Sequence, residues 1–364
     1  MPLPYRADHI GSLLRPLALL RAREANHGRE QLRTIEDEFI LEAIRRQKEI
    51  GLDILTDGEL RRRNFMSDFV DAVAGFDTEK AVSRSWSGQA TSGSVSSVTG
   101  IVTSKLQQMA PLTGHELPFL ETHARGTFKV TLPSATQFPA ISYKRGITDK
   151  IYPTSSDLLW DIVAIMKEEM RSLGSRGVSY IQIDAPRYSY YIDPKWREWI
   201  RTELLQDPDA ALKESVAADN ACLAAARQPG VTLAIHLCRG NNRSHWYAEG
   251  GYDAIAEELF STLDVDRFLL EYDDERSGSF EPLRFVPRGK IVVLGLLSSK
   301  RAKLEDRGAL IRRIREASRY VPLECLALSP QCGFASTAEG NLLSEADQWA
   351  KLKLVAEIAR EVWQ

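Results

Sequence analysis

Hydrophobic residues in this chain fall into eight short runs, many of them β-branched, and most runs end in polar residues. Continuous apolar runs of this length are typical of strands that are buried on both faces of a parallel sheet. The pattern therefore predicts eight strands, which begin near His9, Leu52, Phe128, Tyr180, Val231, Arg267, Ile291 and Leu326.

Between these runs, hydrophobic residues recur at the three- and four-residue spacing of amphipathic helices. The predicted helices cover residues 29–49, 156–173, 209–228, 252–263, 305–318 and 344–362. Gly51 follows the first of them, at the position where a glycine commonly ends a helix. Strands that alternate with helices in this way predict an α/β fold, a single (β/α)₈ TIM barrel over residues 1–364.

Residues 79–104 depart from this pattern, because they are rich in Ser and Gly and only weakly periodic. They follow the second predicted strand and form an inserted loop. One interpretation is a flexible surface loop, and the other is a lid that closes over the mouth of the barrel. Trp86 lies in this otherwise polar segment and favours the lid only slightly, so both interpretations stay open.

The charge balance excludes several classes of partner. Lys and Arg number 47 against 50 Asp and Glu, a formal net charge of −3, so no basic excess indicates a nucleic acid or an anionic membrane. The first residues lack the apolar core of a signal peptide, and no run approaches the ~20 apolar residues of a spanning helix. We expect a cytoplasmic protein that acts on small molecules, and a homo-oligomer is compatible with the sequence.

Polar residues follow the ends of the predicted strands, which is where barrel enzymes carry their active sites. Glu59 lies near the end of the second strand, Asp184 at the end of the fourth and Glu271 at the end of the sixth. Because burying such groups unpaired is unfavourable, this placement indicates a site. The alternatives are that Glu59 pairs with Arg61, Arg62 or Arg63 on the surface and that Asp184 caps a turn.

His236 and Cys238 give the sharpest local signal, since residues two apart in a strand point to the same side. An imidazole and a thiolate at one point suit zinc, and Cys332 and Glu271 would complete a tetrahedral site. The alternatives are another metal, or no metal at all, since isolated buried cysteines usually only fill space. Cys222 and Cys325 are predicted to belong to the core.

Six motifs taken together carry a resemblance to a known family. They are HIGS (9–12), DGE (57–59), IQIDAP (181–186), HLC (236–238), LLEYD (269–273) and SPQCG (329–333). Over nearly its whole length the chain resembles the catalytic C-terminal domain of cobalamin-independent methionine synthase, and its length is similar to that of the single-barrel members. The resemblance implies Zn²⁺ bound by His236, Cys238, Glu271 and Cys332. It also implies that the amino acid part of homocysteine contacts Ile10, Ser12, Glu59 and Asp184.

The chain departs from this family's pattern at several positions. The segment RGNNRSHWYAEGG lengthens the spacing from Cys238 to Glu271, so that Asp273 or Asp274 competes with Glu271 as the fourth ligand. The stretch GLLSSK replaces an Asp-x-His, with Lys300 near the place of the histidine. Ala185 replaces a carboxylate, and no tryptophan corresponds to the one that stacks on the pterin. These departures leave the thiol half of the reaction intact and put a methyl-folate donor in doubt.

A free thiol has a pKa of ~8.5 and is mostly protonated at neutral pH, whereas zinc deprotonates a coordinating thiol. We therefore expect a zinc-dependent methyltransferase that acts on homocysteine in methionine biosynthesis, with the methyl donor open. One alternative is another thiol and an epoxide, as in the related epoxyalkane:coenzyme M transferase. The retained acidic residues argue against it, because a sulfonate would prefer Arg or Lys. Another alternative is a non-catalytic barrel with a structural zinc or a ligand-binding role.

Overall fold

A six-stranded parallel sheet forms the centre of the computed structural model, which describes residues 5–25, 27–79, 83–87, 93–96, 100–124 and 127–363. Each strand pairs with the next one along the chain. The strands are β5 (Lys129–Pro133), β6 (Tyr180–Asp184), β7 (Thr232–Leu237), β8 (Arg267–Glu271), β9 (Ile291–Leu297) and β10 (Leu326–Pro330). All six correspond to predicted strands.

Two irregular segments close this sheet into a barrel. The amide of Asp8 donates to the carbonyl of Leu328 in β10, and the amide of Asp53 donates to the carbonyl of Ala7. The amide of Leu55 donates to Thr127, and the amide of Lys129 in β5 donates back to Leu55. Eight segments thus surround the barrel axis, as expected for the predicted fold.

The first two predicted strands are wrong as regular strands, because each of these segments forms only isolated β-bridges, Ala7 with Leu328 and Leu55 with Phe128. The reason is local side-chain competition for the backbone. The carboxylate of Asp53 accepts hydrogen bonds from the backbone amides of both Arg6 (2.6 Å) and Ala7 (2.9 Å). These amides are then unavailable to a regular ladder.

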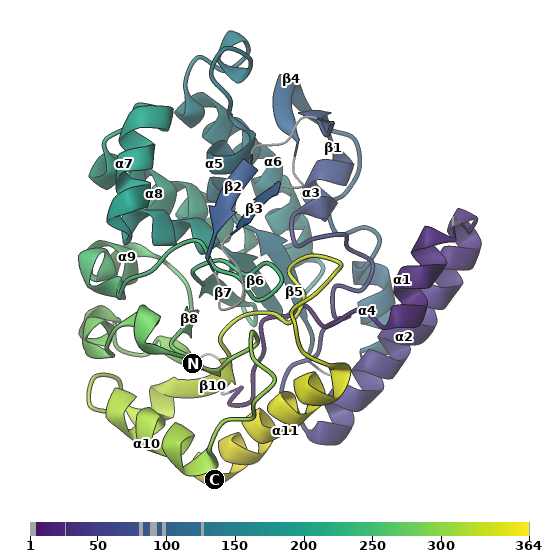
Figure 1. Cartoon of the computed structure of the whole chain (residues 1–364), viewed down its shortest axis with the longest axis vertical. Coiled ribbons are helices and arrows are strands. Elements are labelled where there is room, and N and C mark those ends of the chain that lie inside the picture. Colours follow the sequence, from purple (N-terminus) through teal and green to yellow (C-terminus); the bar gives the residue numbers. More distant parts are fainter. Residues whose placement is uncertain are drawn as a thin grey trace.

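Helices surround the strands in Figure 1, and the six predicted ones are present within a few residues. They are α2 (Arg29–Ile50), α6 (Ser155–Ser175), α8 (Pro208–Ala226), α9 (Ala256–Thr262), α10 (Arg307–Ala317) and α11 (Glu345–Val362). Gly51 ends α2 in the left-handed conformation at φ 82°, as predicted. Shorter helices lie in the connections: α1 (Leu17–Glu24), α3 (Ser67–Ala72), α4 (Leu117–His123), α5 (Pro139–Ser142) and α7 (Pro194–Trp199).

Two antiparallel strand pairs follow α3. Strand β1 (Val73–Asp77) pairs with β4 (Ile101–Gln108), and β2 (Ser83–Trp86) pairs with β3 (Gly93–Ser96). Figure 1 draws β2 and β3 in front of the central strands, and Ser87 forms a bridge with Trp246 in the connection after β7. The predicted loop 79–104 thus contains strands. Its residues 80–82, 88–92 and 97–99 lie outside the described part of the chain, and the lid stays a prediction.

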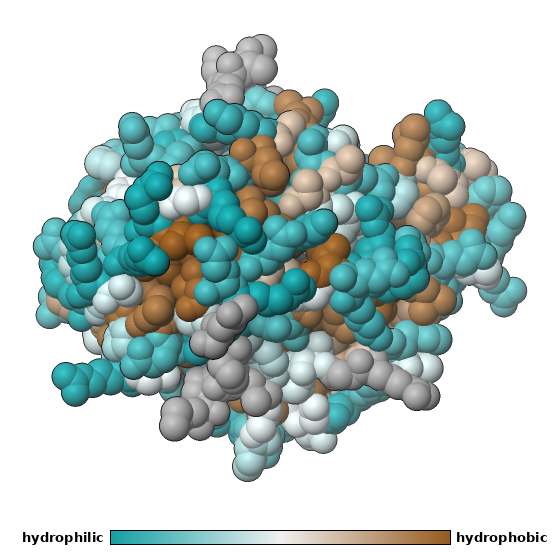
Figure 2. All heavy atoms as spheres, turned by 90° about the horizontal axis from the view of Figure 1, so that it is seen from below, coloured by the Kyte–Doolittle hydropathy of each residue, from teal (hydrophilic) through white to brown (hydrophobic). Residues whose placement is uncertain are grey.

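Figure 2 shows one face of the molecule, where hydrophobic residues form separate patches among hydrophilic ones. Exposed large apolar side chains such as Leu17, Met109 and Leu205 belong to distant segments of the chain. Scattered residues of this kind are normal on protein surfaces. Among the described residues, no helix combines the length and the apolar character needed to cross a lipid bilayer.

Candidate metal centre and thiol cleft

The alternation of side chains along the strands determines which residues face the barrel interior. Ala234 in β7 belongs to a small cluster of buried apolar residues, which we call the inner core cluster. His236 follows two residues later and therefore points the same way. In β8, Leu269 belongs to that cluster, and Glu271 follows it with the same spacing. Candidate ligands on neighbouring strands therefore converge at the carboxyl end of the barrel.

The structure brings His236, Cys238 and Cys332 together, with their ligand atoms all within 4.8 Å of one another and all three residues buried. The Nδ1 atom of His236 lies 3.2 Å from the carbonyl oxygen of Leu269. Its Nε2 atom is buried and has no hydrogen-bond partner among the described residues. A histidine that is oriented through one nitrogen and leaves the other free is typical of a metal ligand. This donor set fits zinc.

The pKa of each cysteine in this group depends on its neighbours. A hydrogen bond from Cys238 and the charge of the nearby His236 imidazole hold the pKa of Cys332 well below its usual value, although burial opposes this shift. The same bond to Cys332, together with burial, raises the pKa of the Cys238 thiol well above its usual value. One of the two sulfur atoms is therefore readily available as a thiolate, the form that binds metals.

The fourth predicted ligand, Glu271, is fully buried but stands outside the group of mutually close ligand atoms. Its Oε2 accepts the amide of Arg239 (2.7 Å), and its Oε1 lies 3.5 Å from Arg276 without a hydrogen-bond partner among the described residues. Asp274, the alternative ligand, accepts a hydrogen bond from the amide of Arg276 and forms an ion pair with the guanidinium of the same residue. Asp273 lies 3.6 Å from Arg276. Glu271 stays the predicted ligand.

A cleft of about 850 Å³ opens beside the three close ligands. The four predicted substrate contacts, Ile10, Ser12, Glu59 and Asp184, all line this cleft. Further lining residues come from the connections beyond the strand ends and carry no signal in the sequence: Asn64, Phe65, Met66, Gln137, Arg187, Asn241 and Tyr247. We call it the thiol cleft, after the two cysteine thiols that line it; it joins the candidate metal ligands to the two carboxylates Glu59 and Asp184.

Glu59 is buried rather than exposed, which corrects the alternative that it pairs with arginines on the surface. Its Oε1 accepts a hydrogen bond from the hydroxyl of Thr131 (3.0 Å), and its Oε2 lies 3.6 Å from the Nη1 atom of Arg62. Arg62 in turn donates to the hydroxyl (2.9 Å) and to the carbonyl (2.8 Å) of Thr131. Arg62 and Thr131 thus position the Glu59 carboxylate.

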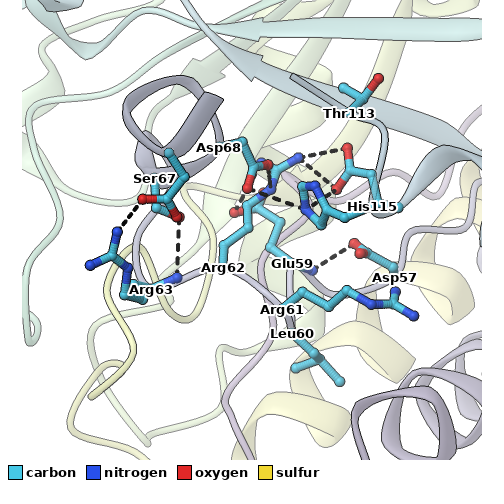
Figure 3. Close-up of polar contacts among 12 residues, drawn as sticks. Asp57, Glu59, Leu60, Arg61, Arg62, Arg63, Ser67, Asp68, Thr113 and His115 are labelled. Carbon is cyan, nitrogen blue, oxygen red and sulfur yellow. Dashed lines mark hydrogen bonds and ion pairs between the residues drawn. The ribbon is translucent and has the colours of Figure 1, made fainter. Parts of the chain in front are cut away.

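Figure 3 shows the guanidinium of Arg62 among several acidic side chains. It lies 2.5 Å from Asp68 and donates to both carboxylate oxygens of Glu116 at 2.8 Å. The Nε2 atom of His115 lies 3.2 Å from Asp68, a contact across 47 residues that no local sequence pattern reveals. Asp68, His115 and Glu116 also have mutually close ligand atoms. Arg62 already supplies the cation there, so this group does not fit a metal.

Burial makes the carboxylates around the cleft hard to ionise. It raises the pKa of Asp184 to about 7, with nearby His236 opposing the shift. Burial likewise raises the pKa of Glu59, against the effect of Arg62, and that of Glu116 to about 8. His9 is buried too, and its Nε2 atom lies 3.2 Å from the carbonyl of Ile54. A positively charged group in the cleft would stabilise the ionised carboxylates.

Known proteins share both the sequence pattern and the fold. The family model for the catalytic domain of cobalamin-independent synthase matches residues 15–360. The uncharacterized protein YxjH of Bacillus subtilis is 41% identical over 99% of this chain and 95% of its own length. The methionine synthase of Pyrococcus abyssi is 25% identical over 89% of this chain and 84% of its own.

Two solved structures cover the chain almost completely. A candidate vitamin-B12-independent methionine synthase from Listeria monocytogenes has a TM-score of 0.74 at 28% identity and covers 100% of this chain and 99% of its own. A B12-independent methionine synthase from Shewanella sp. W3-18-1, solved with selenomethionine, has a TM-score of 0.71 at 21% identity and covers 99% and 98%. With its matching family model and fold, the chain belongs to the cobalamin-independent methionine synthase family, a family of methyltransferases.

Proposed function

We propose that this protein is a zinc-dependent methyltransferase that transfers a methyl group to the thiol of homocysteine. The observation that carries the proposal is the meeting of His236, Cys238 and Cys332 in one cleft with Glu59 and Asp184. The soft ligands suit a metal that binds a thiol. The two carboxylates suit the ammonium group of an amino acid.

Each side chain has a separate role in this proposal. His236, Cys238 and Cys332 would hold the zinc ion, with Glu271 as the predicted fourth ligand. The chemistry that a bound zinc ion supplies is the deprotonation of a coordinating thiol at neutral pH. Glu59, held by Thr131 and Arg62, and Asp184 bind the substrate ammonium and so direct the thiol sulfur toward the cysteines. Orientation of this kind can contribute several powers of ten in rate.

The metal centre is tested by Cys332→Ser, with Cys325→Ser as the matched control. Cys325 is partly buried against the core and lies outside the cleft. Cys332→Ser is expected to lose bound zinc, measured by elemental analysis after dialysis, because a hydroxyl is a poor ligand for this metal. Cys325→Ser is expected to keep its zinc. Full zinc occupancy in Cys332→Ser would contradict the assignment.

The thiol substrate is tested by X-ray absorption at the zinc edge, with and without homocysteine. An active site of the proposed kind gains one sulfur neighbour when homocysteine is added, and a non-catalytic structural zinc does not. Coenzyme M serves as the competing thiol. If zinc gains a sulfur neighbour with coenzyme M but not with homocysteine, the substrate is the sulfonate thiol and not the amino acid.

A further inference from the structure

A second cavity, of about 950 Å³, lies among the loops that follow β7, β8 and β9. His245 lines it together with five Lys and Arg residues: Arg243, Arg276, Lys300, Arg301 and Lys303. Trp246, Ser244 and Ser298 also line it, and no Asp or Glu does. We call it the basic cavity. Its composition is the reverse of the thiol cleft, which carries Glu59 and Asp184.

Lys300 is the distinctive residue of the basic cavity. It is 6% exposed, and its buried Nζ atom has no hydrogen-bond partner among the described residues. Asp273 lies near enough for its carboxylate to interact with the charge of Lys300. A buried ammonium that donates no hydrogen bond is still unfavourable, so such a group is normally kept where a ligand completes it. The Nη1 atom of Arg276 is also buried without a hydrogen-bond partner in the described part of the chain.

Acidic neighbours neutralise only part of this charge. Asp274 lies 2.9 Å from Arg276 and 3.3 Å from Arg301, and Glu271 and Asp273 lie 3.5 Å and 3.6 Å from Arg276. The indole of Trp246 packs against the Arg276 guanidinium at 4.1 Å from the ring centroid, which holds that cation in place. The remaining basic side chains leave the cavity with an excess of positive charge.

The basic cavity adjoins the metal centre. Ser299, the residue before Lys300, donates its amide to the side chain of Gln331 (2.7 Å), the residue before Cys332. Arg276 contacts Glu271, the predicted fourth ligand. Lys300 and Arg276 therefore stand between the candidate ligands and the basic cavity, while the thiol cleft approaches the same ligands from the carboxylates Glu59 and Asp184.

We propose that the basic cavity binds a phosphate or carboxylate group of the second substrate, the alkyl donor. Anion binding follows from the lining alone, whereas the identification of the anion as the donor rests on the proposed function. The anionic group of the donor and the ammonium group of the thiol substrate would then reach the metal centre from two sides. The acidic cleft repels the anionic donor, and the basic cavity repels the ammonium of the thiol.

The test is calorimetric titration of the zinc-loaded full chain, at constant ionic strength, with inorganic phosphate in one arm and glutarate in the other. We expect saturable one-to-one binding in at least one arm, and the stronger arm identifies the anionic group. Lys300→Met and Arg243→Gln are each expected to weaken binding about tenfold or more. Lys213→Gln, an exposed lysine on α8, is the matched control and should leave binding unchanged.

Thermal melting of each variant establishes that it is folded, and the exposed Arg243 provides a second test if Lys300→Met does not fold. Binding of neither anion, or equal affinity in both cavity variants, overturns the site. Saturating anion should leave homocysteine binding intact; displacement of homocysteine would place the anion in the thiol cleft and overturn the assignment. If an anion binds but homocysteine does not, the anion site stands and the proposed function fails.

Discussion

Glu59 adopts a backbone conformation that is uncommon for a residue with a side chain, at φ 54°. Its amide is bound by the Asp57 carboxylate at 2.8 Å, and its own carboxylate is bound by Thr131 at 3.0 Å. Strained conformations of this kind persist where the surroundings hold them, and they concentrate at functional sites. The sequence DGE identifies the acidic residue, but it does not reveal the backbone strain that directs the side chain into the cleft.

Glu59→Gln is expected to weaken homocysteine binding by roughly tenfold to a hundredfold, because hydrogen bonds to charged groups contribute about 1.5–3 kcal/mol. Calorimetry on the zinc-loaded protein measures this change. The control ligand is 4-mercaptobutyrate, which has the thiol and the carboxylate but no ammonium. The affinity for this control ligand should hardly change. An equal loss of affinity for both thiols would show that Glu59 does not bind the ammonium group.

At the level of elements, the first barrel segment leaves room for the Glu59 carboxylate, because the residue beside that carboxylate is a glycine, Gly11. Gly11 has φ 140°, and a Cβ atom there would lie 2.9 Å from Glu59 Oε1 and 3.0 Å from Thr131 Cγ2. Gly177, with φ 75°, offers a control, since a Cβ atom there meets nothing within 4 Å. A change to alanine at Gly177 therefore tests backbone strain alone, which costs roughly 1–2 kcal/mol.

Gly11→Ala is expected to lower both stability and homocysteine affinity, because the new methyl group displaces the Glu59 carboxylate. Gly177→Ala should lower stability only. Urea unfolding measures stability, and calorimetry with homocysteine measures affinity. Unchanged affinity in a folded Gly11→Ala protein would mean that the carboxylate has room to move, and the positioning argument would fail.

Hydrophobic patterning predicted the six regular strands and the main helices because both depend on local periodicity. It failed around Ala7, where the Asp53 carboxylate replaces ladder hydrogen bonds, and around Leu55, where the side chain of Gln47 binds the amide and the carbonyl of Thr56. The strand-end argument predicted that His236, Cys238 and Cys332 meet at one rim of the barrel, and the structure has their ligand atoms within 4.8 Å of one another. The pairing of Arg62 with Glu116 depends on contacts between distant residues, so no local pattern revealed it.

On the scale of the whole molecule, the barrel interior separates two kinds of buried charge. Asp8 pairs with Lys129 at 2.8 Å, and Arg267 lies 3.5 Å from the same carboxylate, all fully buried. These charges are matched, whereas near the carboxyl rim Asp184 forms no ion pair with a Lys or Arg among the described residues, and the ammonium of Lys300 donates no hydrogen bond there. Matched charges specify the fold, and the unmatched ones are those that ligands would complete.

Asp219 in α8 is a buried carboxylate away from the metal centre, and its effect on stability can be tested through pH. It accepts hydrogen bonds from the hydroxyls of Ser134 (2.7 Å) and Tyr188 (2.9 Å), and no basic side chain pairs with it among the described residues. Burial raises the pKa of Asp219 to about 7. The folded state then holds a proton that the unfolded state releases near pH 4.

Since the folded pKa of Asp219 is raised, its contribution to stability is full below about pH 4 and is lost as the pH rises toward 7. Asp219→Asn has no such loss, because an amide does not titrate. The unfolding free energy of Asp219→Asn minus that of the unchanged protein should therefore increase between pH 5 and pH 8, by on the order of a few kcal/mol at roughly 1.4 kcal/mol per pKa unit. Urea unfolding of both proteins at the two pH values measures it, and a difference that stays constant would mean that Asp219 is ionised throughout.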